Sequence, residues 1–277
     1  MRNTIKTAVV AAVTGALALG LTACGAGSGS GSSDAADGPL VVAATPVPHA
    51  EVLTYIRDNL AKDAGLELEV KEFQDYVAPN TATDEGSVDA NYFQTAPYLE
   101  EFNKENGTKL TPVAEVHLEP LGLYSDSIRS TGDLKAGATV GIPNDGSNEA
   151  RALKLLDANG LIELKDGAGE NATPKDIAKN PKKLEFKELE AAQLPRSLAD
   201  LDAAVINGNY AISADLNPAK DALVLEKAEN NPYTNLLVVN KGNEDDPRVK
   251  KLAKLLTSEE VRKFIEDKYD GSVVPAF

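Results

Sequence analysis

Residues 40–73 read as strand, helix and strand, and this order constrains the fold more than any other feature of the chain. Leu40–Ala44 is a short apolar run typical of a buried strand. Glu51–Ala64 places its apolar residues on one helical face, and Gly65 follows as a stop signal. Leu66–Phe73 alternates apolar and polar residues, as a half-exposed strand does. This opening predicts an α/β fold with a largely parallel sheet.

A second unit of the same kind begins near Gly137 and predicts a second lobe. A strand over Ala138–Ile142 is followed by the loop PNDGS and by a helix over Glu149–Asn159. Two lobes of this type commonly hold a small molecule between them. The remaining predicted elements are strands at Leu184–Leu189, Ala203–Ile206 and Leu236–Val239, a short helix over Pro195–Leu201, and an amphipathic tail over Pro247–Tyr269.

Residues 1–23 have the features of a secretory signal peptide. Arg2 and Lys6 give a positive start, and Thr7–Gly20 consists almost entirely of Ala, Val, Leu and Gly. A bilayer-spanning helix needs about 20 apolar residues, so this stretch is too short to span. The run Leu21–Cys24 contains the only cysteine and resembles the lipobox of bacterial lipoproteins. The resemblance implies that Cys24 is the lipidation site and the mature N-terminus, with palmitate among its acyl chains.

Residues 24–38 follow as a predicted Gly/Ser-rich tether. Such a composition is flexible and cannot bury a core. Two acyl chains would hold the protein stably on a lipid surface, where one chain holds it only marginally. The predicted location is therefore the extracytoplasmic face of the cell membrane. The simpler alternative is a signal peptide that happens to end near a free cysteine.

Composition narrows the possible partners and chemistry. The formal charge of −15 repels nucleic acid and anionic lipid headgroups, so no nucleic-acid partner is expected. No phosphate-binding loop, dinucleotide fingerprint or zinc-protease motif occurs, and we expect no cofactor, no metal and no catalytic residue. His49, beside two prolines, is interpreted as a loop residue, and His117 as a hydrogen-bonded strand histidine. A secreted hydrolase with a pair of carboxylates stays open as an alternative.

Aromatic residues gather in one part of the chain. They make up only 5% of the sequence, yet six of them fall within residues 73–102, in segments rich in loop-forming residues. Aromatic side chains on loops between strands often line a pocket. The alternative is that they belong to the core, and this is the preferred interpretation of Phe73 and Phe102. The six residues are Phe73, Tyr76, Tyr92, Phe93, Tyr98 and Phe102.

Arg151 is a second indication of a binding site. The predicted helix puts it in the first turn, where the positive end of the helix dipole disfavours a cation. An arginine there is explained if an anion docks on the free backbone N–H groups and the guanidinium together. A carboxylate suits the planar guanidinium well. The alternative is a solvated arginine without a role.

Several segments together resemble the family of methionine-binding lipoproteins of ABC importers, the NlpA or MetQ family. They are FQDYVAPN, DANYFQTAPYLEEF, VGIPNDGSNEARALKLLDANGLIELKDG, ELEAAQLPRSLADLDAAVINGNYA and NPYTNLLVV. The resemblance covers the mature chain. It implies a two-lobed periplasmic-binding-protein type II architecture with two crossover segments, near Val116–Tyr124 and Asn231–Leu237. Lobe 1 would comprise residues 39–118 and 236–277, and lobe 2 residues 119–235.

The family also implies a role for each matching residue. Tyr76, Phe93 and Tyr98 match the pocket for the ligand side chain, and Arg151 matches the arginine that pairs with the ligand carboxylate. Asn207 and Asn235 match the polar contacts to the amino-acid backbone, with Asn148 assisting. Thr95 stands where many members have histidine, so a hydroxyl replaces an imidazole at the pocket wall.

The function implied is capture of methionine, as the L form, the D form or both, for a permease driven by an ATPase. Within the same class, a methionine-containing dipeptide such as Gly-Met, or another apolar amino acid, is the alternative, because Thr95 could enlarge the pocket. A lipoprotein with an adhesive or structural role and no ligand is a further alternative. The mechanism expected from the family is hinged closure of the lobes around the ligand.

Overall fold

Within residues 38–277, strands and helices alternate and build two main β-sheets and one small two-stranded sheet. The computed structural model describes residues 38–277. The predicted signal peptide, Cys24 and almost all of the predicted tether therefore lie outside the described residues. Within residues 38–277, no helix combines the length and the apolar character needed to cross a membrane.

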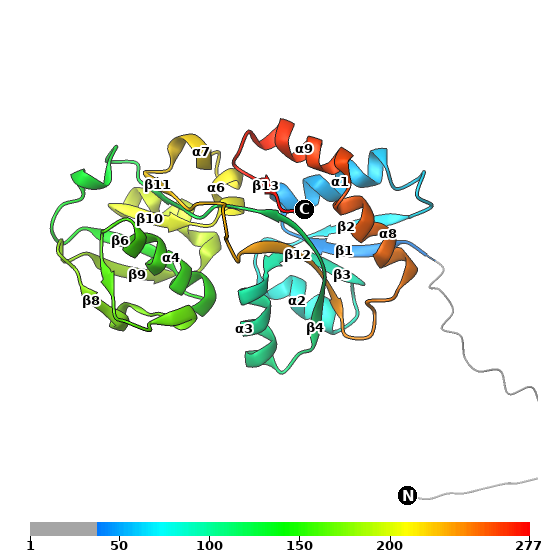
Figure 1. Cartoon of the computed structure of the whole chain (residues 1–277), viewed down its shortest axis with the longest axis horizontal. Helices are drawn as coiled ribbons and strands as arrows, with labels where there is room; N and C mark the ends of the chain where they lie inside the picture. Colours follow the sequence, from blue (N-terminus) through cyan, green and yellow to red (C-terminus); the bar gives the residue numbers. More distant parts are fainter. Residues whose placement is uncertain (1–37) are drawn as a thin grey trace, which may run out of the picture. The chain divides into compact units, whose positions relative to one another are not determined.

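The first sheet has six strands in the order β13-β4-β12-β3-β1-β2 (Figure 1). β1 pairs in parallel with both β2 and β3, as the opening strand–helix–strand pattern predicts. β12 enters from the far end of the chain and pairs antiparallel with β3 and β4, and β13 pairs antiparallel with β4, so the sheet is mixed and not largely parallel as predicted. The strands are β1 Leu40–Ala44, β2 Leu68–Glu72, β3 Ala90–Thr95, β4 Leu110–Leu118, β12 Thr234–Asn240 and β13 Val274–Pro275.

Helices cover both faces of this sheet. Because successive strand side chains point to opposite faces, Leu40 and Val42 join the core under α1 (Glu51–Asn59), α8 (Pro247–Leu256) and α9 (Glu259–Tyr269). Ala43 points to the other face and packs with Ala82 and Val88, at α2 (Val77–Asp84) and after it. α3 (Ala96–Asn106) follows β3 directly. The first sheet thus holds a full core of its own.

The second sheet has five strands in the order β11-β5-β10-β6-β9. β6 pairs in parallel with β9 and β10, whereas β5 runs antiparallel to β10. Its apolar clusters are separate from the core of the first sheet. The strands are β5 Gly122–Tyr124, β6 Thr139–Pro143, β9 Glu185–Leu189, β10 Ala203–Ile206 and β11 Val224–Leu225. The helices are α4 Gly146–Ala158, α5 Leu194–Ser197, α6 Gly208–Ser213 and α7 Pro218–Asp221. The small sheet pairs β7 Glu163–Leu164 with β8 Ile177–Lys179.

The chain passes between the two sheets twice. β4 of the first sheet ends at Leu118 and β5 of the second begins at Gly122, and β11 returns to β12 through residues 226–233. We call residues 119–121 and 226–233 the crossover segments. The two are tied together, because the Glu226 N–H donates to the Leu121 carbonyl at 2.9 Å and the Leu121 N–H donates to the Glu226 carboxylate at 3.1 Å.

Three predictions about the helices and aromatic residues around the first sheet are corrected. The first helix ends at Asn59 rather than Ala64, because the chain unwinds at Leu60 into a series of turns that closes at Gly65. The amphipathic tail is two helices, since Ser258 caps α9 by accepting a hydrogen bond from the Val261 N–H.

The aromatic segment is the third correction, because most of it is regular structure. Tyr92 and Phe93 lie on β3, Tyr98 lies in the first turn of α3, and Tyr76 is the residue before α2. Phe102 is buried with Phe93 and Tyr98, and Phe73 is half-buried against the cluster under α2. Successive residues of β3 point to opposite faces of the sheet, so Tyr92 joins the core under α1 whereas Phe93 packs with Tyr98 and Phe102.

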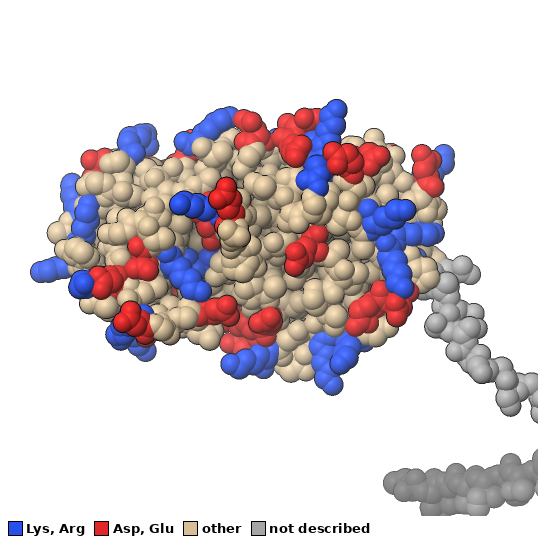
Figure 2. All heavy atoms as spheres, viewed as in Figure 1, with Lys and Arg blue, Asp and Glu red and all other residues tan. Residues whose placement is uncertain are grey.

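The surface carries charges of both signs. Figure 2 shows Lys and Arg side chains interspersed with Asp and Glu on the visible face.

Candidate functional site

One pocket is lined by residues of the first sheet and its helices, of the first crossover segment, and of α4 and the start of α6, which follow strands of the second sheet. The space between its walls is about 350 Å³, a volume that includes the open mouth. All eight residues predicted to contact a ligand line it: Tyr76, Phe93, Thr95, Tyr98, Asn148, Arg151, Asn207 and Asn235. Sequence reasoning missed four others, Gln94, Glu119, Gly208 and Asn209.

The position of the pocket follows from the direction of the strands. β3 carries Thr95 at its carboxyl end, and β6 and β10 are followed by the loops that begin α4 and α6. Ligands of α/β sheets bind outside the carboxyl ends of the strands, where helix N-termini present free N–H groups. The register then brings Asn235 opposite Thr95 on one side and opposite His117 on the other.

Three aromatic rings form the apolar wall of the pocket. The ring centroids of Tyr76 and Phe93 lie 5.8 Å apart, those of Tyr76 and Tyr98 lie 5.6 Å apart, and those of Phe93 and Tyr98 lie 6.1 Å apart. These separations are typical of mutually packed rings. Leu236 and Val238 of β12 support Phe93 and Tyr98 from behind. The wall can pack against an apolar side chain of a ligand.

Arg151 lies in the second turn of α4, which corrects the prediction of a first-turn position. The helix begins at Gly146 because Asp145 caps it, accepting a hydrogen bond of 2.9 Å from the Asn148 N–H. The dipole argument for Arg151 therefore loses most of its force, since the effect fades within the first turn. Its side chain is nevertheless buried and lines the pocket.

The guanidinium of Arg151 is held by both crossover segments. Its Nε lies 3.0 Å from Glu226 Oε1 and its Nη2 lies 2.5 Å from Glu226 Oε2. Nη2 also donates to the Glu119 carbonyl at 2.9 Å, and the Tyr233 ring lies 4.2 Å from the guanidinium carbon. Within residues 38–277, Nη1 makes no side-chain hydrogen bond. A fixed guanidinium with one free donor edge can bind a carboxylate from the pocket.

The amide side chains of Asn148 and Asn207 meet beyond the carboxyl ends of the neighbouring strands β6 and β10. Asn207 Nδ2 donates to Asn148 Oδ1 at 2.8 Å, and Asn148 Nδ2 donates in turn to Asp145 Oδ1 at 2.8 Å. The other atom of the Asn207 amide, Oδ1, is buried without a hydrogen-bond partner among the described residues. Buried acceptors are nearly always satisfied, so this atom indicates that a donor from outside the chain completes it.

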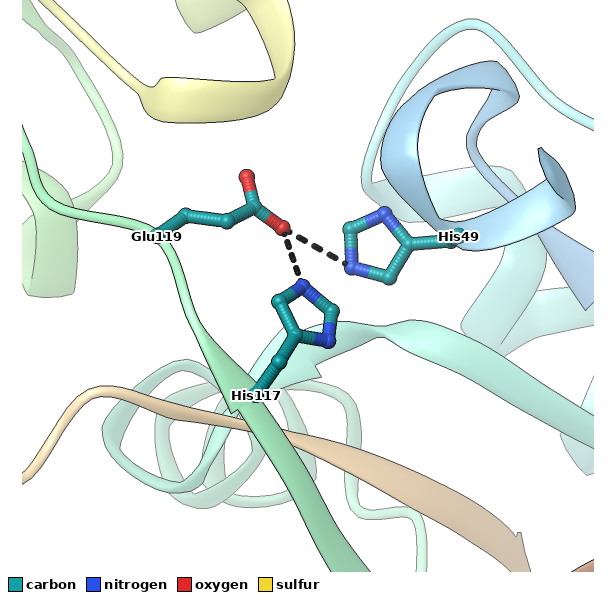
Figure 3. A group of neighbouring side chains, drawn as sticks. All are labelled: His49, His117 and Glu119. Atoms are coloured by element: carbon teal, nitrogen blue, oxygen red, sulfur yellow. Dashed lines mark hydrogen bonds and ion pairs between the residues drawn. The ribbon is translucent and has the colours of Figure 1, made fainter. Parts of the chain in front are cut away.

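Glu119 is the acidic residue of the pocket, and it belongs to a buried polar group (Figure 3). Its Oε1 lies 2.8 Å from His117 Nε2 and 3.2 Å from His49 Nε2, and all three residues are buried. His49 Nε2 also lies 3.0 Å from Asn235 Oδ1. Burial lowers the pKa of His49 to about 4 and that of His117 to about 3, so both imidazoles are neutral near pH 7.

The prediction for His49 is corrected by this geometry, and that for His117 is extended. His49 was predicted to be a loop residue, but it lies in the helical turn Pro46–Ala50 after β1, and its side chain is buried. His117 is a hydrogen-bonded strand histidine, as predicted, but one of its partners lines the pocket. The acid two residues after His117 was the available sequence signal for Glu119. Only the fold brings His49 to meet them.

Three hydrogen bonds close the cleft over the pocket. The Tyr76 hydroxyl donates to Asn209 Oδ1 at 2.6 Å, and the Tyr210 hydroxyl donates to the Gln74 carbonyl at 3.1 Å. The Ser147 N–H at the start of α4 donates to Glu101 Oε2 on α3 at 2.8 Å. Each bond joins an element next to the first sheet to a helix of the second, so the structure has a closed cleft.

The arrangement separates three kinds of chemistry within one small space. The pocket is lined by aromatic rings, by the Arg151 guanidinium with its free donor, and by two acceptors, the Glu119 carboxylate and the unsatisfied amide oxygen of Asn207. A molecule that carries an apolar chain, a carboxylate and an ammonium group on one carbon satisfies all three.

Comparisons with known proteins agree with this chemistry. Residues 40–277 match the model of the NlpA lipoprotein family. The methionine-binding lipoprotein MetQ of Bacillus subtilis strain 168 is 46% identical over 241 residues, which cover 85% of this chain and 87% of that protein. The D-methionine-binding lipoprotein MetQ of Escherichia coli K12 is 40% identical over 270 residues, 96% of each chain.

Among solved structures, a nutrient binding protein from Burkholderia cenocepacia bound to methionine has a TM-score of 0.83 and 47% sequence identity. The match covers 86% of this chain and 100% of that chain. This likeness, with the two sheets and the two crossover segments, confirms the predicted two-lobed α/β architecture.

Proposed function

We propose that this chain, which belongs to the NlpA lipoprotein family, is an extracytoplasmic substrate-binding protein of an ABC importer that captures free methionine. The ligand would be the L form, the D form or both. The permease and its ATPase would be the partners that receive it. Capture and delivery involve no bond making or breaking, so we propose no enzymatic activity.

The observation that carries the proposal is the unsatisfied Asn207 Oδ1, which lines the same pocket as the Glu119 carboxylate and the Arg151 guanidinium. Two acceptors and a cationic donor in one pocket fit the two charges of an α-amino acid. Leaving a buried acceptor without a partner costs about 1–3 kcal/mol, which a bound ammonium would recover. A neutral ligand without an amine leaves this group unsatisfied.

In the proposed complex, the ligand carboxylate binds Arg151 Nη1, and the ammonium group lies between Asn207 Oδ1 and Glu119. The Asn235 amide can donate from Nδ2, because its Oδ1 is engaged by His49. The thioether side chain lies against Tyr76, Phe93 and Tyr98. Contacts between a thioether sulfur and aromatic rings contribute about 0.3–1.5 kcal/mol each, which favours methionine over a plain hydrocarbon chain.

Closure of the cleft is proposed as the signal that the permease reads. We divide the chain into lobe 1, residues 39–118 with 236–277, and lobe 2, residues 119–235. Arg151 supports this model, because it contacts both crossover segments as well as the pocket. A carboxylate bound to Arg151 would therefore act on the hinges directly.

Attachment to the membrane is proposed to occur through lipid on Cys24. The family is one of lipoproteins, and Cys24 follows a signal-like leader. The Gly/Ser-rich residues after it would let the binding body reach a permease in the same membrane.

Native mass spectrometry of freshly purified protein tests the proposal. The expected spectrum shows a folded protein that carries one small molecule, which leaves on activation with the mass of methionine. The mass of a methionine-containing dipeptide would move the assignment to that alternative. A protein that carries nothing and gains no thermal stability with either methionine enantiomer would contradict the proposal.

A further inference from the structure

The two buried histidines do not line the pocket, so the proposed ligand contacts leave them without a role. His49 comes from the segment after β1 and His117 from the end of β4, and both reach Glu119 in the first crossover segment (Figure 3). Burying two imidazoles and a carboxylate together is costly unless each polar atom is paired. Here every imidazole nitrogen has a partner.

The carboxylate determines where the protons are. An ionised Glu119 can only accept, so His117 Nε2 must carry a proton and donate it across the 2.8 Å contact. In a neutral imidazole, Nδ1 then holds a lone pair, and the Tyr92 hydroxyl at 2.5 Å must donate to it. The strand register and the alternation of β3 place Tyr92 on this inner side, with its ring fully buried.

His49 repeats the pattern and divides its proton between two acceptors. Its Nδ1 accepts from the Thr45 hydroxyl at 2.7 Å. Its Nε2 donates to Asn235 Oδ1 at 3.0 Å and lies 3.2 Å from Glu119 Oε1. One imidazole therefore orients both an amide and a carboxylate of the pocket.

We propose that His49 and His117 are positioning residues: as neutral N–H donors held by Thr45 and Tyr92, they keep Glu119 ionised and aimed at the ligand's ammonium group. This inference rests on the proposed function. Through this role, the two histidines make the pocket select ligands that carry a positively charged amine over carboxylic acids that are identical but lack the amine.

The charge balance around Glu119 supports the proposal. Within residues 38–277, the only basic side chains within ion-pair distance of its carboxylate are the two histidines, which burial keeps neutral. Burial raises the pKa of Glu119, while His49, Arg151 and the Asn209 N–H act in the opposite direction. The titratable groups that face it from the surrounding elements are His49, Tyr76, Tyr92, His117, Arg151, Tyr210 and Tyr269. Without the N–H donors of His49 and His117, the Glu119 carboxylate would gain a proton, and the pocket would lose its negative charge.

The same three side chains could also be ligands of a zinc ion. Zinc would need the lone pairs of both Nε2 atoms, whereas the hydrogen bonds of the group use these atoms as donors. The two arrangements require opposite tautomers, so experiment can separate them.

The test compares His117→Gln, which retains an N–H near the position of Nε2, with His117→Leu, which has no donor. Each variant is titrated calorimetrically with L-methionine and with 4-(methylthio)butanoate, the same acid without the amine, at pH 6, 7 and 8.

Wild-type affinity for L-methionine should be nearly constant over this range. His117→Gln should stay close to wild type, whereas His117→Leu should lose about tenfold at pH 6 and recover part of it by pH 8, because the pKa of Glu119 rises. Binding of the amine-free acid should not follow this profile.

Two further variants keep the proposal falsifiable if His117→Leu fails to fold. Tyr92→Phe removes the hydroxyl behind His117 and should shift the pH profile in the same direction by a smaller amount. Glu119→Gln should reduce the preference for L-methionine over the amine-free acid by about tenfold or more.

Equal, pH-independent losses for both ligands in His117→Leu would show a merely structural role and overturn the proposal. An unchanged ligand preference in Glu119→Gln would overturn it too. Stoichiometric zinc in the purified protein, with methionine binding lost on chelation, would replace it by a metal site. If wild type binds neither ligand, the proposed function fails instead.

Discussion

Asn207 Nδ2 donates a hydrogen bond of 2.8 Å to Asn148 Oδ1, and this bond turns the other end of the Asn207 amide, Oδ1, toward the pocket, where it has no partner among residues 38–277. Asn207 precedes α6 but makes no capping bond to it. Its side chain is therefore placed for a ligand more than for the stability of the helix.

Replacing Asn207 with Ala should weaken methionine binding far more than it weakens the fold. Loss of an acceptor for an ammonium group should cost about 1.5–3 kcal/mol of binding free energy. The free energy of unfolding should fall by less, because the lost hydrogen bond to Asn148 Oδ1 is offset by removal of an unsatisfied buried atom. Isothermal calorimetry and urea unfolding measure the two effects.

Asn217→Ala is the matched control. Asn217 caps α7 and does not line the pocket, so stability should fall and affinity should not. The reverse pattern would contradict the assignment.

Replacing Arg151 with Ala should reduce affinity by about 2–5 kcal/mol, since the ligand carboxylate loses its charged donor. Stability should also fall, because Glu226 is left half-buried without its partner. The double variant Arg151→Ala, Glu226→Gln should recover stability while affinity stays low. Calorimetry and thermal melts follow the two quantities separately. If affinity returned together with stability, Arg151 would act on the fold and not on the ligand.

The stability of the protein should depend on the ionisation of Glu149. This residue is 7% exposed, and its Oε1 has no hydrogen-bond partner among the described residues. Burial, with the nearby carboxylates of Glu188, Asp145 and Glu101, raises its pKa to about 7. A raised pKa means that the folded state favours the protonated form, so the stabilisation is present at low pH and is lost as pH rises through 7.

Glu149→Gln should therefore be more stable than wild type at pH 8, by about 1–3 kcal/mol, and the difference should shrink toward pH 5. Urea unfolding at both pH values measures it. A constant difference between pH 5 and pH 8 would show that Glu149 does not titrate in this range.

Replacing Cys24 with Ala should release the protein from the membrane fraction, because the proposed lipid attachment site is gone. Fractionation of cells and immunoblotting measure the distribution. Met-binding activity of the released protein serves as the control that the body still folds. Retention of the variant in the membrane fraction would contradict anchoring through Cys24.

Much of the fold could be predicted because local periodicity agrees with the final structure. The bounds of Leu40–Ala44 and Ala203–Ile206 were predicted as observed, since short apolar runs of this length are typical of buried strands. The starts and ends of helices were less predictable. The N-terminus of α4 was misplaced because Asp145, and not a residue next to the apolar run, provides the cap.

The pocket was predictable only where single residues were unusual. Family resemblance and residue type pointed to the eight residues that the fold brings together. Glu119 was overlooked because an acid after an apolar strand looks like an ordinary end of the strand. His49 was misread because its burial depends on contacts with residues more than 60 positions away, such as Glu119 and Asn235. Long-range contacts of this kind leave no local pattern.

The central claim is that two acceptors, one guanidinium and three aromatic rings bind the zwitterion of methionine in this pocket. Calorimetric titration of ligand-free protein, obtained by unfolding, dialysis and refolding, tests it most directly. The account predicts saturable binding of one L- or D-methionine per chain, and no comparable binding of the amine-free acid 4-(methylthio)butanoate. A folded, ligand-free protein that binds neither enantiomer, or that binds the amine-free acid equally well, would contradict it.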